Sequence, residues 1–356
     1  MKILAIDMGW SNSVSCLFDS QTGEVQYQTL ITGKEPFAKL LKEMNPDQVV
    51  IEAGPMAGWV RDLCEQLKLR LLVLNTNDEP WRWRNVKKKT DRQDAFKLTR
   101  IAALGEGSRV HVPEHSVRQW RQLIYYRQTL VDEMVSIKNR LRAVLLGEDL
   151  RLPCGQKAWE AESWRKLSEM ARNVQECGKD ELWRGMVKIE LKRLEELGAH
   201  LAEVEKKLDG IGKEDERVKR LKQVPGVGTR TAELVVALID NPHRFGRGRK
   251  VSSYAGLAPR KHQSGKMDRT GHISRCGNGL LRKYLVQAAW SGKRGSARMS
   301  RIYERVRKSS PRRSKQAIVA VARHLLVWLW AMLRDGSDWR QSKELAPPEN
   351  KLLQAT

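Results

Sequence analysis

Residues 2–30 of the chain read KILAIDMGWSNSVSCLFDSQTGEVQYQTL. Three apolar-rich segments in this stretch, residues 2–7, 13–18 and 24–30, are separated by short turns at Met8-Gly9 and at residues 21–23. Turns that contain glycine between short apolar runs are typical of strands that fold back on one another. The stretch therefore predicts a meander of three antiparallel strands.

The following residues alternate between helical and strand patterns. Apolar side chains at three- and four-residue steps predict helices near residues 37–44 and 60–67, and apolar runs predict strands at residues 48–53 and 71–74. Three antiparallel strands followed by helix, strand, helix and strand is the order of the ribonuclease-H fold. We therefore expect an α/β domain of this kind over residues 1–112.

Four carboxylates take special positions in this pattern. Asp7 ends the first predicted strand, Glu52 lies at the end of the fourth, and Asp91 and Asp94 begin a helix three residues apart, so that they share a face. Four carboxylates at one edge of a sheet would repel one another unless a hard divalent cation lies among them. One or two Mg²⁺ ions would suit such oxygen ligands and leave waters for a phosphate. The alternative for each acid alone is structural, as a turn residue, a helix cap or a surface carboxylate.

The middle of the chain, residues 113–216, is predicted to form helical arms. Apolar residues recur at helical steps from Val117 to about Val144, and a heptad seam runs through residues 187–208 with Glu190 as its one polar position. A turn at residues 153–155 separates the two arms. A hairpin or coiled coil of this kind either mediates self-association or packs within the chain, and the pattern fits both.

The last domain, residues 217–338, is predicted to be mostly helical. A Pro-Gly-Val-Gly turn at residues 225–228 precedes an apolar helix. This turn resembles a helix-hairpin-helix element, in which glycines let the backbone approach a phosphate at a helix N-terminus. A plain turn capped by Thr229 is the alternative. Residues 339–356 are polar and are expected to form a flexible tail.

The chain carries a large excess of positive charge. Its 66 Lys and Arg against 42 Asp and Glu give a net charge of +24. Between Arg244 and Arg313 there are 20 Lys and Arg and only two acids, Asp268 and Glu304. Charge concentrated in this way, and interleaved with glycine and apolar helix, favours a surface that binds nucleic acid over an ordinary solvated face.

Composition also indicates the compartment. Five cysteines without CxxC spacing fit reduced thiols and favour neither a disulfide framework nor a zinc site. The best apolar run, residues 325–333, has about half of the ~20 residues that cross a bilayer, so we expect a buried helix. The N-terminus lacks the long apolar stretch of a signal peptide. We expect a cytoplasmic protein without a membrane partner.

Several motifs make the chain recognisable. AIDMGWSNS (residues 5–13), VVIEAGPMAGW (49–59) and KKTDRQDA (88–95) resemble the DEDD transposase family of bacterial insertion sequences, and the likeness continues in residues 223–239 and 253–290. The resemblance spans roughly residues 1–335. It implies a RuvC-like N-terminal domain in which Asp7, Glu52, Asp91 and Asp94 are the Mg²⁺-dependent catalytic carboxylates.

The resemblance also implies a nucleophilic serine in the C-terminal domain. The serine-glycine step after the Gly-Leu-x-Pro segment places it at Ser264, and Ser274 is the main rival. Attack by a serine on a phosphodiester would store the bond energy in a phosphoserine ester, so that strands can be rejoined without ATP. Neighbouring cations would activate the hydroxyl, whereas His262 is expected to be a surface residue and not a base.

Residues expected to contact nucleic acid lie in three segments. In WRWRNVKKKTDR (residues 81–92), tryptophans would stack on exposed bases while basic side chains hold phosphates, or else the tryptophans pack in a loop. The other segments are the turn at residues 225–228 and the basic surroundings of the serine. The full set is Trp81, Arg82, Trp83, Arg84, Lys87, Lys88, Lys89, Gly226, Gly228, Arg260, Lys261, Lys266, Arg269 and Arg275.

The sequence contains no obvious module that reads bases. In the resembled family, a structured non-coding RNA encoded by the element, the bridge RNA, selects donor and target DNA. The resemblance also implies a homo-oligomer, a dimer or tetramer, in which the carboxylates of one subunit meet the serine domain of another. We therefore predict an RNA-guided DNA recombinase.

Three other functions would account for parts of the sequence. A structure-selective nuclease, such as a junction resolvase, would use the four carboxylates alone and would form no serine ester. A sugar kinase or actin-like ATPase would need a second phosphate loop, which the sequence lacks. A non-catalytic RNA-binding protein would leave the carboxylates unexplained.

Overall fold

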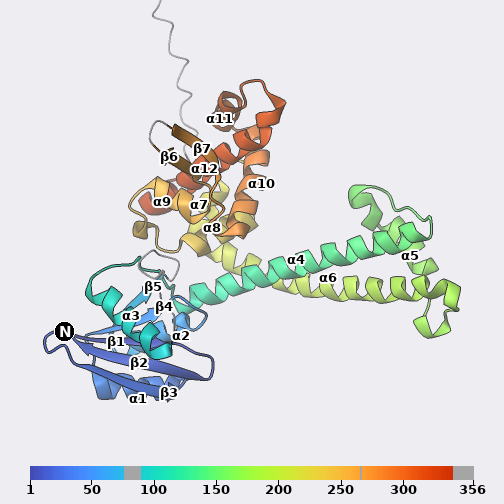
Figure 1. The fold of residues 1–356 in the computed structure, drawn as a ribbon. Helices are drawn as coiled ribbons and strands as arrows, with labels where there is room; N and C mark the ends of the chain where they lie inside the picture. The colour runs from blue at the N-terminus through green and yellow to red at the C-terminus, as the bar shows by residue number, and fades with distance from the viewer. Residues whose placement is uncertain (76–89, 265–266, 340–356) are drawn as a thin grey trace, which may run out of the picture. The chain divides into compact units, whose positions relative to one another are not determined.

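The computed structural model describes residues 1–75, 90–264 and 267–339 (Figure 1). The chain divides into two compact units between Gln119 and Trp120. This division lies a few residues after the predicted end of the first domain. The arm and the C-terminal helices fall in one unit, because apolar residues of the arm helices belong to the core of the C-terminal helices.

The first unit contains a five-stranded sheet in the order β3-β2-β1-β4-β5. β1, β2 and β3 are antiparallel, while β4 and β5 run parallel to β1. The predicted order of strands and helices in this part of the chain is confirmed. The strands are β1 (Lys2–Asp7), β2 (Asn12–Asp19), β3 (Val25–Ile31), β4 (Gln48–Glu52) and β5 (Arg70–Leu74).

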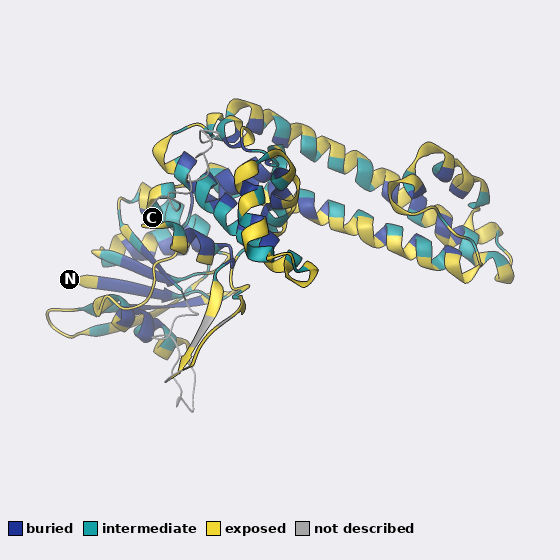
Figure 2. Cartoon of the chain, turned by 90° about the horizontal axis from the view of Figure 1, so that it is seen from above, coloured by how far each residue is buried: buried dark blue, intermediate teal, exposed yellow. Residues whose placement is uncertain are grey.

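Helices cover both faces of this sheet. Alternation along β1 sends Leu4 and Ile6 to one face, where they pack with α1 (Lys34–Met44) and α2 (Ala57–Gln66). Ile3 and Ala5 point to the other face, which is covered by α3 (Asp91–Ala103). The middle strands are therefore buried on both sides (Figure 2).

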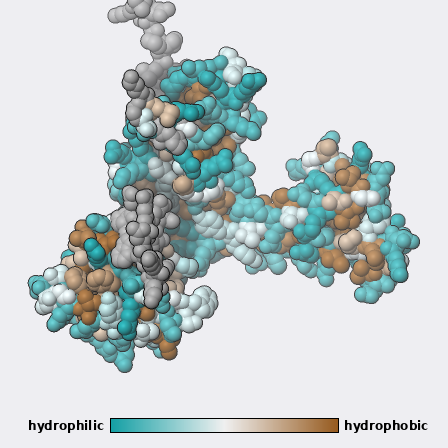
Figure 3. Space-filling view, in the orientation of Figure 1, coloured by the Kyte–Doolittle hydropathy of each residue, from teal (hydrophilic) through white to brown (hydrophobic). Residues whose placement is uncertain are grey.

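The arm is an antiparallel pair of long helices, α4 (His115–Gly147) and α6 (Leu182–Glu214), in the second unit apart from the first residues of α4. Its outer end is closed by α5 (Ala161–Met170) and three 3-10 turns, Gly155–Trp159, Val174–Glu176 and Lys179–Glu181. Apolar residues of α4 and α6 pack against each other, so much of the predicted seam is used within the chain. Figure 3 shows further apolar side chains gathered at the outer end of the arm.

The polar position of the seam has a partner inside the arm. Glu190 accepts hydrogen bonds from Arg140 of α4, with Nε–Oε1 2.9 Å and Nη2–Oε2 3.2 Å. The glutamate that interrupts the heptad thus forms an ion pair between the two arm helices.

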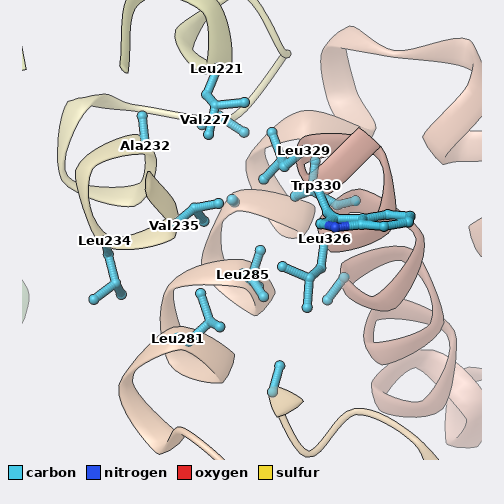
Figure 4. Packing of buried hydrophobic residues seen from close by; sticks show 14 of the residues in the cluster. Leu221, Val227, Ala232, Leu234, Val235, Leu281, Leu285, Leu326, Leu329 and Trp330 are labelled. Carbon is cyan, nitrogen blue, oxygen red and sulfur yellow. The ribbon is translucent and has the colours of Figure 1, made fainter. Parts of the chain in front are cut away.

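The body of the second unit is mostly helical, as predicted. Every residue of α8 from Thr231 to Ile239 is buried, and α8 packs with α10 and α12 (Figure 4). The helices are α7 (Glu216–Lys222), α8 (Thr229–Ile239), α9 (Gly248–Tyr254), α10 (Gly279–Gly295), α11 (Ala297–Arg307) and α12 (Ser314–Asp335), with 3-10 turns at Pro242–Arg244 and Pro311–Arg313.

The predicted apolar helix near the C-terminus is a core helix. Among the described residues, only the segment Pro311–Asp335 is long and apolar enough to cross a membrane. Half of its most apolar 18-residue stretch is buried inside the protein. Leu325, Leu326 and Leu329 are fully buried among α8 and α10. All five cysteines are free thiols in the structure.

One element differs from the mostly helical prediction. β6 (Pro259–Ser264) and β7 (Met267–Ile273) form an antiparallel hairpin between α9 and α10. The strand pattern was missed because the two strands, PRKHQS and MDRTGHI, are largely polar and lack the apolar alternation that a half-buried strand shows.

Candidate functional site

Asp7 and Glu52 lie at adjacent positions on neighbouring parallel strands. The β1–β4 register pairs Ala5 with Val50 and Ile6 with Ile51, so Asp7 is the next residue of β1 and Glu52 the next of β4. Because side chains alternate along a strand, the two carboxylates share the face of Ala5 and Val50. That face is covered by α3, and both acidic residues are half-buried. The sequence prediction that these residues meet at one sheet edge is consistent with this register.

Helix α3 brings Asp94 to the same face of the sheet. Asp94, Leu98 and Ile101 follow each other at steps of four and three residues and therefore share one face of the helix. Leu98 and Ile101 pack on the sheet beside Ala5 and Val50. Asp94, one turn before Leu98, is half-buried.

Asp91 is the first residue of α3, at the exposed end of this face. Thr90 caps the helix, and its side chain accepts a hydrogen bond from the Gln93 N–H (3.3 Å). The cap is therefore Thr90 and not Asp91, which rules out the helix-cap alternative and leaves Asp91 as an exposed acid in the first turn. An acid in the first turn also stabilises the helix N-terminus.

The carboxylates are placed on one side of the sheet but do not form a closed cage. Asp7, Glu52 and Asp94 each interact with neighbouring groups. Within residues 1–75, 90–264 and 267–339, no three His, Cys, Asp or Glu side chains gather closely enough to hold a metal ion. The donor chemistry nevertheless fits a hard divalent cation, since the adjacent Asp7 and Glu52 offer carboxylate oxygens on one face.

Lys97 is a further charged residue at this face that sequence reasoning missed. It is 6% exposed and lies three residues after Asp94 on α3. A lysine is buried to this degree only when its ammonium is compensated, and Lys97 does interact with neighbouring groups. The signal in the sequence was its position between Asp94 and Leu98, on the helix face that meets the sheet.

Ser264 lies at the outer end of the β6–β7 hairpin. It is the last residue of β6, pairs with Met267, and is exposed. Met267 and Arg269 are two residues apart on β7, so Arg269 is on the same face of the hairpin as Ser264. An exposed hydroxyl with a guanidinium on its own face suits attack on a phosphodiester, because the positive charge favours the oxyanion.

The inner end of the hairpin is held by backbone hydrogen bonds. Ser274 N–H donates to Ala258 O (2.8 Å), and Arg275 N–H donates to Gly256 O (3.2 Å). Gly277 has φ +153°, and a Cβ there would lie 2.4 Å from the Tyr254 carbonyl oxygen. Only glycine allows this approach of two backbones. The hairpin that carries Ser264 is therefore anchored at its inner end.

The two candidate serines differ in access. Ser274 is half-buried at the base of the hairpin, where its carbonyl oxygen accepts a hydrogen bond from Arg260 Nη2 (3.1 Å). Ser264 is exposed at the outer end. A nucleophile must reach the substrate, so the geometry favours Ser264. Ser264 and the carboxylates lie in different compact units.

Comparison with known proteins gives two family matches, one that ends with α4 and one in the C-terminal helices. The DEDD transposase model of IS110-type elements matches residues 4–148, and the model of the transposase IS116/IS110/IS902 family matches residues 218–304. Together these segments cover more than half of the chain. The chain belongs to the IS110-type DEDD transposase family. It is therefore a DNA recombinase/transposase, which confirms the predicted enzyme class.

Individual transposases match over most of their length. The transposase for insertion sequence element IS1111A of Coxiella burnetii is 27% identical over 297 residues, 81% of this chain and 77% of the relative. A probable family 20 transposase of Pseudomonas aeruginosa is 29% identical over 301 residues, 82% of this chain and 85% of the relative. A pilin gene-inverting protein of Moraxella lacunata is 30% identical over 119 residues, 33% of this chain and 37% of the relative.

Some arginines in the basic segment of this transposase, residues 244–313, stabilise its fold. Arg244 donates to the carbonyl oxygens of Leu238 and Ile239 at the end of α8 (3.0 and 3.2 Å) and stacks on Phe245. Arg282 donates to Ala255 O (3.0 Å). Most of the others are exposed, among them Arg247, Arg249, Lys250, Arg260, Arg269, Arg275, Arg294, Arg301, Arg305, Lys308, Arg312 and Arg313.

The two glycines of the predicted helix-hairpin-helix turn have different surroundings. Gly226 has φ +83°, and a Cβ there would lie 2.3 Å from Ala288 O and 2.4 Å from Gly292 N of α10. The backbone of Gly226 therefore packs closely against α10. Gly228 is exposed, with open space around it, and precedes α8. Of the two, Gly228 is the one placed where a phosphate could approach.

Several predicted nucleic-acid contacts lie outside the described residues and remain predictions. These are Trp81, Arg82, Trp83, Arg84, Lys87, Lys88, Lys89 and Lys266, together with the side chain of Lys261.

Proposed function

We propose that this transposase cuts and rejoins the DNA of an insertion sequence with two groups of residues. The carboxylates Asp7, Glu52, Asp91 and Asp94 would form a RuvC-like, Mg²⁺-dependent site, and Ser264 would be the nucleophile. The observation that carries the proposal is the register of β1 and β4, which gives Asp7 and Glu52 adjacent positions under α3. The strand order, with three antiparallel strands followed by two parallel ones, supports a RuvC-like unit.

The carboxylates would hold the metal and position the scissile phosphate. Asp7, Glu52 and Asp94 line the face between sheet and helix, and the exposed Asp91 would approach from the helix N-terminus. Mg²⁺, when bound, would neutralise charge on the phosphate oxygens. Metal-free carboxylates would repel that phosphate, so these residues need a cation to act on DNA.

Ser264 would carry the covalent step. Its Oγ would attack phosphorus and form a P–O bond, while the bond to one DNA oxygen breaks and that oxygen takes up the hydroxyl proton. A phosphodiester replaces a phosphodiester, so a DNA hydroxyl can reverse the step without ATP. A relative named for inverting a pilin gene fits this chemistry, since inversion requires cut ends to be joined again.

DNA and a guide RNA would bind to the basic surfaces. The exposed arginines and lysines after residue 244 would hold phosphates, which position a backbone without reading its sequence. A bridge RNA that pairs with donor and target DNA would supply the specificity. The net charge of +24 supports more than one polyanion. A cytoplasmic location fits these partners.

The arm would carry contacts between subunits of a dimer or tetramer. Leu182, Met186 and Ile189 are 45–50% exposed and follow each other at helical steps on α6. An exposed apolar stripe beside the seam that α4 already fills supports association of two chains. Such an assembly would let the carboxylates of one subunit act with the serine of another.

Assays of DNA products test the proposal. Protein, Mg²⁺, the element's non-coding RNA and labelled donor and target DNA should give joined donor–target products, which Asp7→Asn and Ser264→Ala should each abolish. Cleaved but never joined DNA that is unchanged in Ser264→Ala would contradict the proposal and support the junction-resolvase alternative.

A further inference from the structure

The turn between β1 and β2 presents the most exposed large hydrophobic side chain of the described residues. Trp10 is 94% exposed, although the strands on either side of it are buried. Tryptophan combines a large apolar surface with few rotatable bonds, so an ordered and exposed tryptophan is well suited to bind a flat partner. It adds nothing to the core of this unit.

The backbone that carries Trp10 is fixed on both sides. Thr32 Oγ1 donates to Gly9 O (2.8 Å), and the Thr32 N–H donates to Ser11 O (2.9 Å). A Cβ on Gly9 would lie 2.2 Å from Asn12 O, so the turn closes as tightly as glycine allows. The backbone at Trp10 is therefore held by its neighbours.

Trp10 lies at the same edge of the sheet as the acidic residues. Trp10 follows Asp7 by three residues, which limits the distance between their Cα atoms to about 10 Å. In sheets with parallel strands, ligands bind outside the carboxyl ends of the strands, and β1 and β4 both end here. Ile31, which pairs with Asn12 and is 70% exposed, adds apolar surface at the same edge.

We propose that Trp10 stacks on an unpaired base of the DNA strand whose phosphate is held at the carboxylates. This proposal rests on the proposed function. A base is a flat partner that neighbours every scissile phosphate, and the reach from Asp7 to Trp10 is of the order of a nucleotide step. Stacking on a π-face is tolerant of sequence, as expected where a guide RNA supplies specificity. Trp10 acts as a positioning residue that fixes the strand relative to the carboxylates.

Binding of a short single strand that contains 2-aminopurine tests the stacking. With Ca²⁺ in place of Mg²⁺ to prevent cleavage, wild-type protein should quench the probe at one position of the strand. Trp10→Ala should abolish that quenching and weaken single-strand binding by about 5- to 150-fold, the effect of losing one stacked base. Trp10→Phe should retain most of both, and duplex affinity should be unchanged. Leu146→Ala, which removes an exposed apolar side chain of the arm, is the control.

Equal weakening of single-strand and duplex binding by Trp10→Ala, or unchanged quenching, would overturn the proposal. Binding of an RNA strand of the same sequence tests whether the stacked base belongs to DNA or to RNA. A larger loss of affinity for DNA than for RNA in Trp10→Ala supports the proposal, and a larger loss for RNA overturns it. Cleavage by Asp7→Asn distinguishes the two proposals. If Trp10→Ala changes neither quenching nor single-strand affinity while Asp7→Asn abolishes cleavage, the stacking proposal is wrong and the proposed function stands.

Discussion

The carboxylates at the ends of β1 and β4 allow a test in which shape is kept and charge is removed. Asp7→Asn and Glu52→Gln should lower Mg²⁺-dependent DNA cleavage by at least about 100-fold, the upper end of what losing even an outer partner of a metal site costs. DNA affinity measured by filter binding should change little, because the basic surfaces supply it. Glu35→Gln, an exposed acid in the first turn of α1, is the matched control. Equal cleavage by all three variants would contradict a catalytic role for Asp7 and Glu52.

At the level of single residues, the sequence predicts positions that follow from strand ends. Asp7 and Glu52 could be predicted because each ends an apolar run, and a shared strand direction then implies a shared edge. Lys97 and Trp10 could not be predicted in the same way. The burial of a lysine depends on which helix face meets the sheet, and the exposure of Trp10 depends on how tightly the turn closes.

Among the individual elements, the β6–β7 hairpin depends on a glycine at its base. Gly277→Ala would place a Cβ 2.4 Å from Tyr254 O at φ +153°, which should cost about 1–3 kcal/mol of stability. It should also displace Ser264 and lower strand joining more than DNA binding. Gly279→Ala is the control, because its Cβ would meet only Arg282, at 3.7 Å. The prediction is measured as the free energy of unfolding and the yield of joined product, and it is wrong if the two variants behave alike.

Helix α8 contains a buried acid that should make stability depend on pH. Burial raises the pKa of Glu233 to about 7, against the lowering effect of Arg230, whose Nη1 donates to Glu233 Oε2 (2.7 Å). The unfolded chain releases this proton near pH 4.5, whereas the folded chain keeps it to about pH 7. The free energy of unfolding should therefore fall as pH rises from 4.5 to 7, by up to ~3 kcal/mol from this group.

Glu233→Gln, which keeps the shape of the side chain, should flatten that part of the pH profile. Chemical denaturation of both proteins across the range measures the difference. Parallel profiles for wild type and Glu233→Gln would show that Glu233 ionises alike in the folded and unfolded chains.

The elements also show where sequence patterns fail. The sheet and the long helices could be predicted because the strands are short apolar runs, as in β1, and the helices repeat apolar residues at helical steps, as in α6. The polar β6–β7 hairpin and the 3-10 turns that close the arm have no such pattern. The motif at residues 225–228 predicts that the backbone of Gly226 approaches a phosphate. In the structure its close neighbour is α10, a contact that depends on tertiary packing.

At the scale of the whole molecule, the charge of +24 should appear as strong salt dependence. If about six phosphates are neutralised, the logarithm of the DNA association constant should fall with the logarithm of salt concentration with a slope near −5. Arg301→Ala, at an exposed position of α11, should reduce the magnitude of that slope by about 1. Lys166→Ala at the outer end of the arm is the control, and a slope near zero for the wild type would contradict a phosphate-binding surface.

Strand cleavage through a serine ester can be measured directly. Mg²⁺, the element's RNA and end-labelled DNA are incubated with the protein, and labelled protein–DNA adducts are isolated under denaturing conditions, digested with protease and mapped by mass spectrometry. The proposed mechanism predicts an adduct on Ser264 that is absent in Ser264→Ala and in Asp7→Asn and retained in Ser274→Ala. Cleaved DNA without any adduct, or an adduct on Ser274, would contradict it.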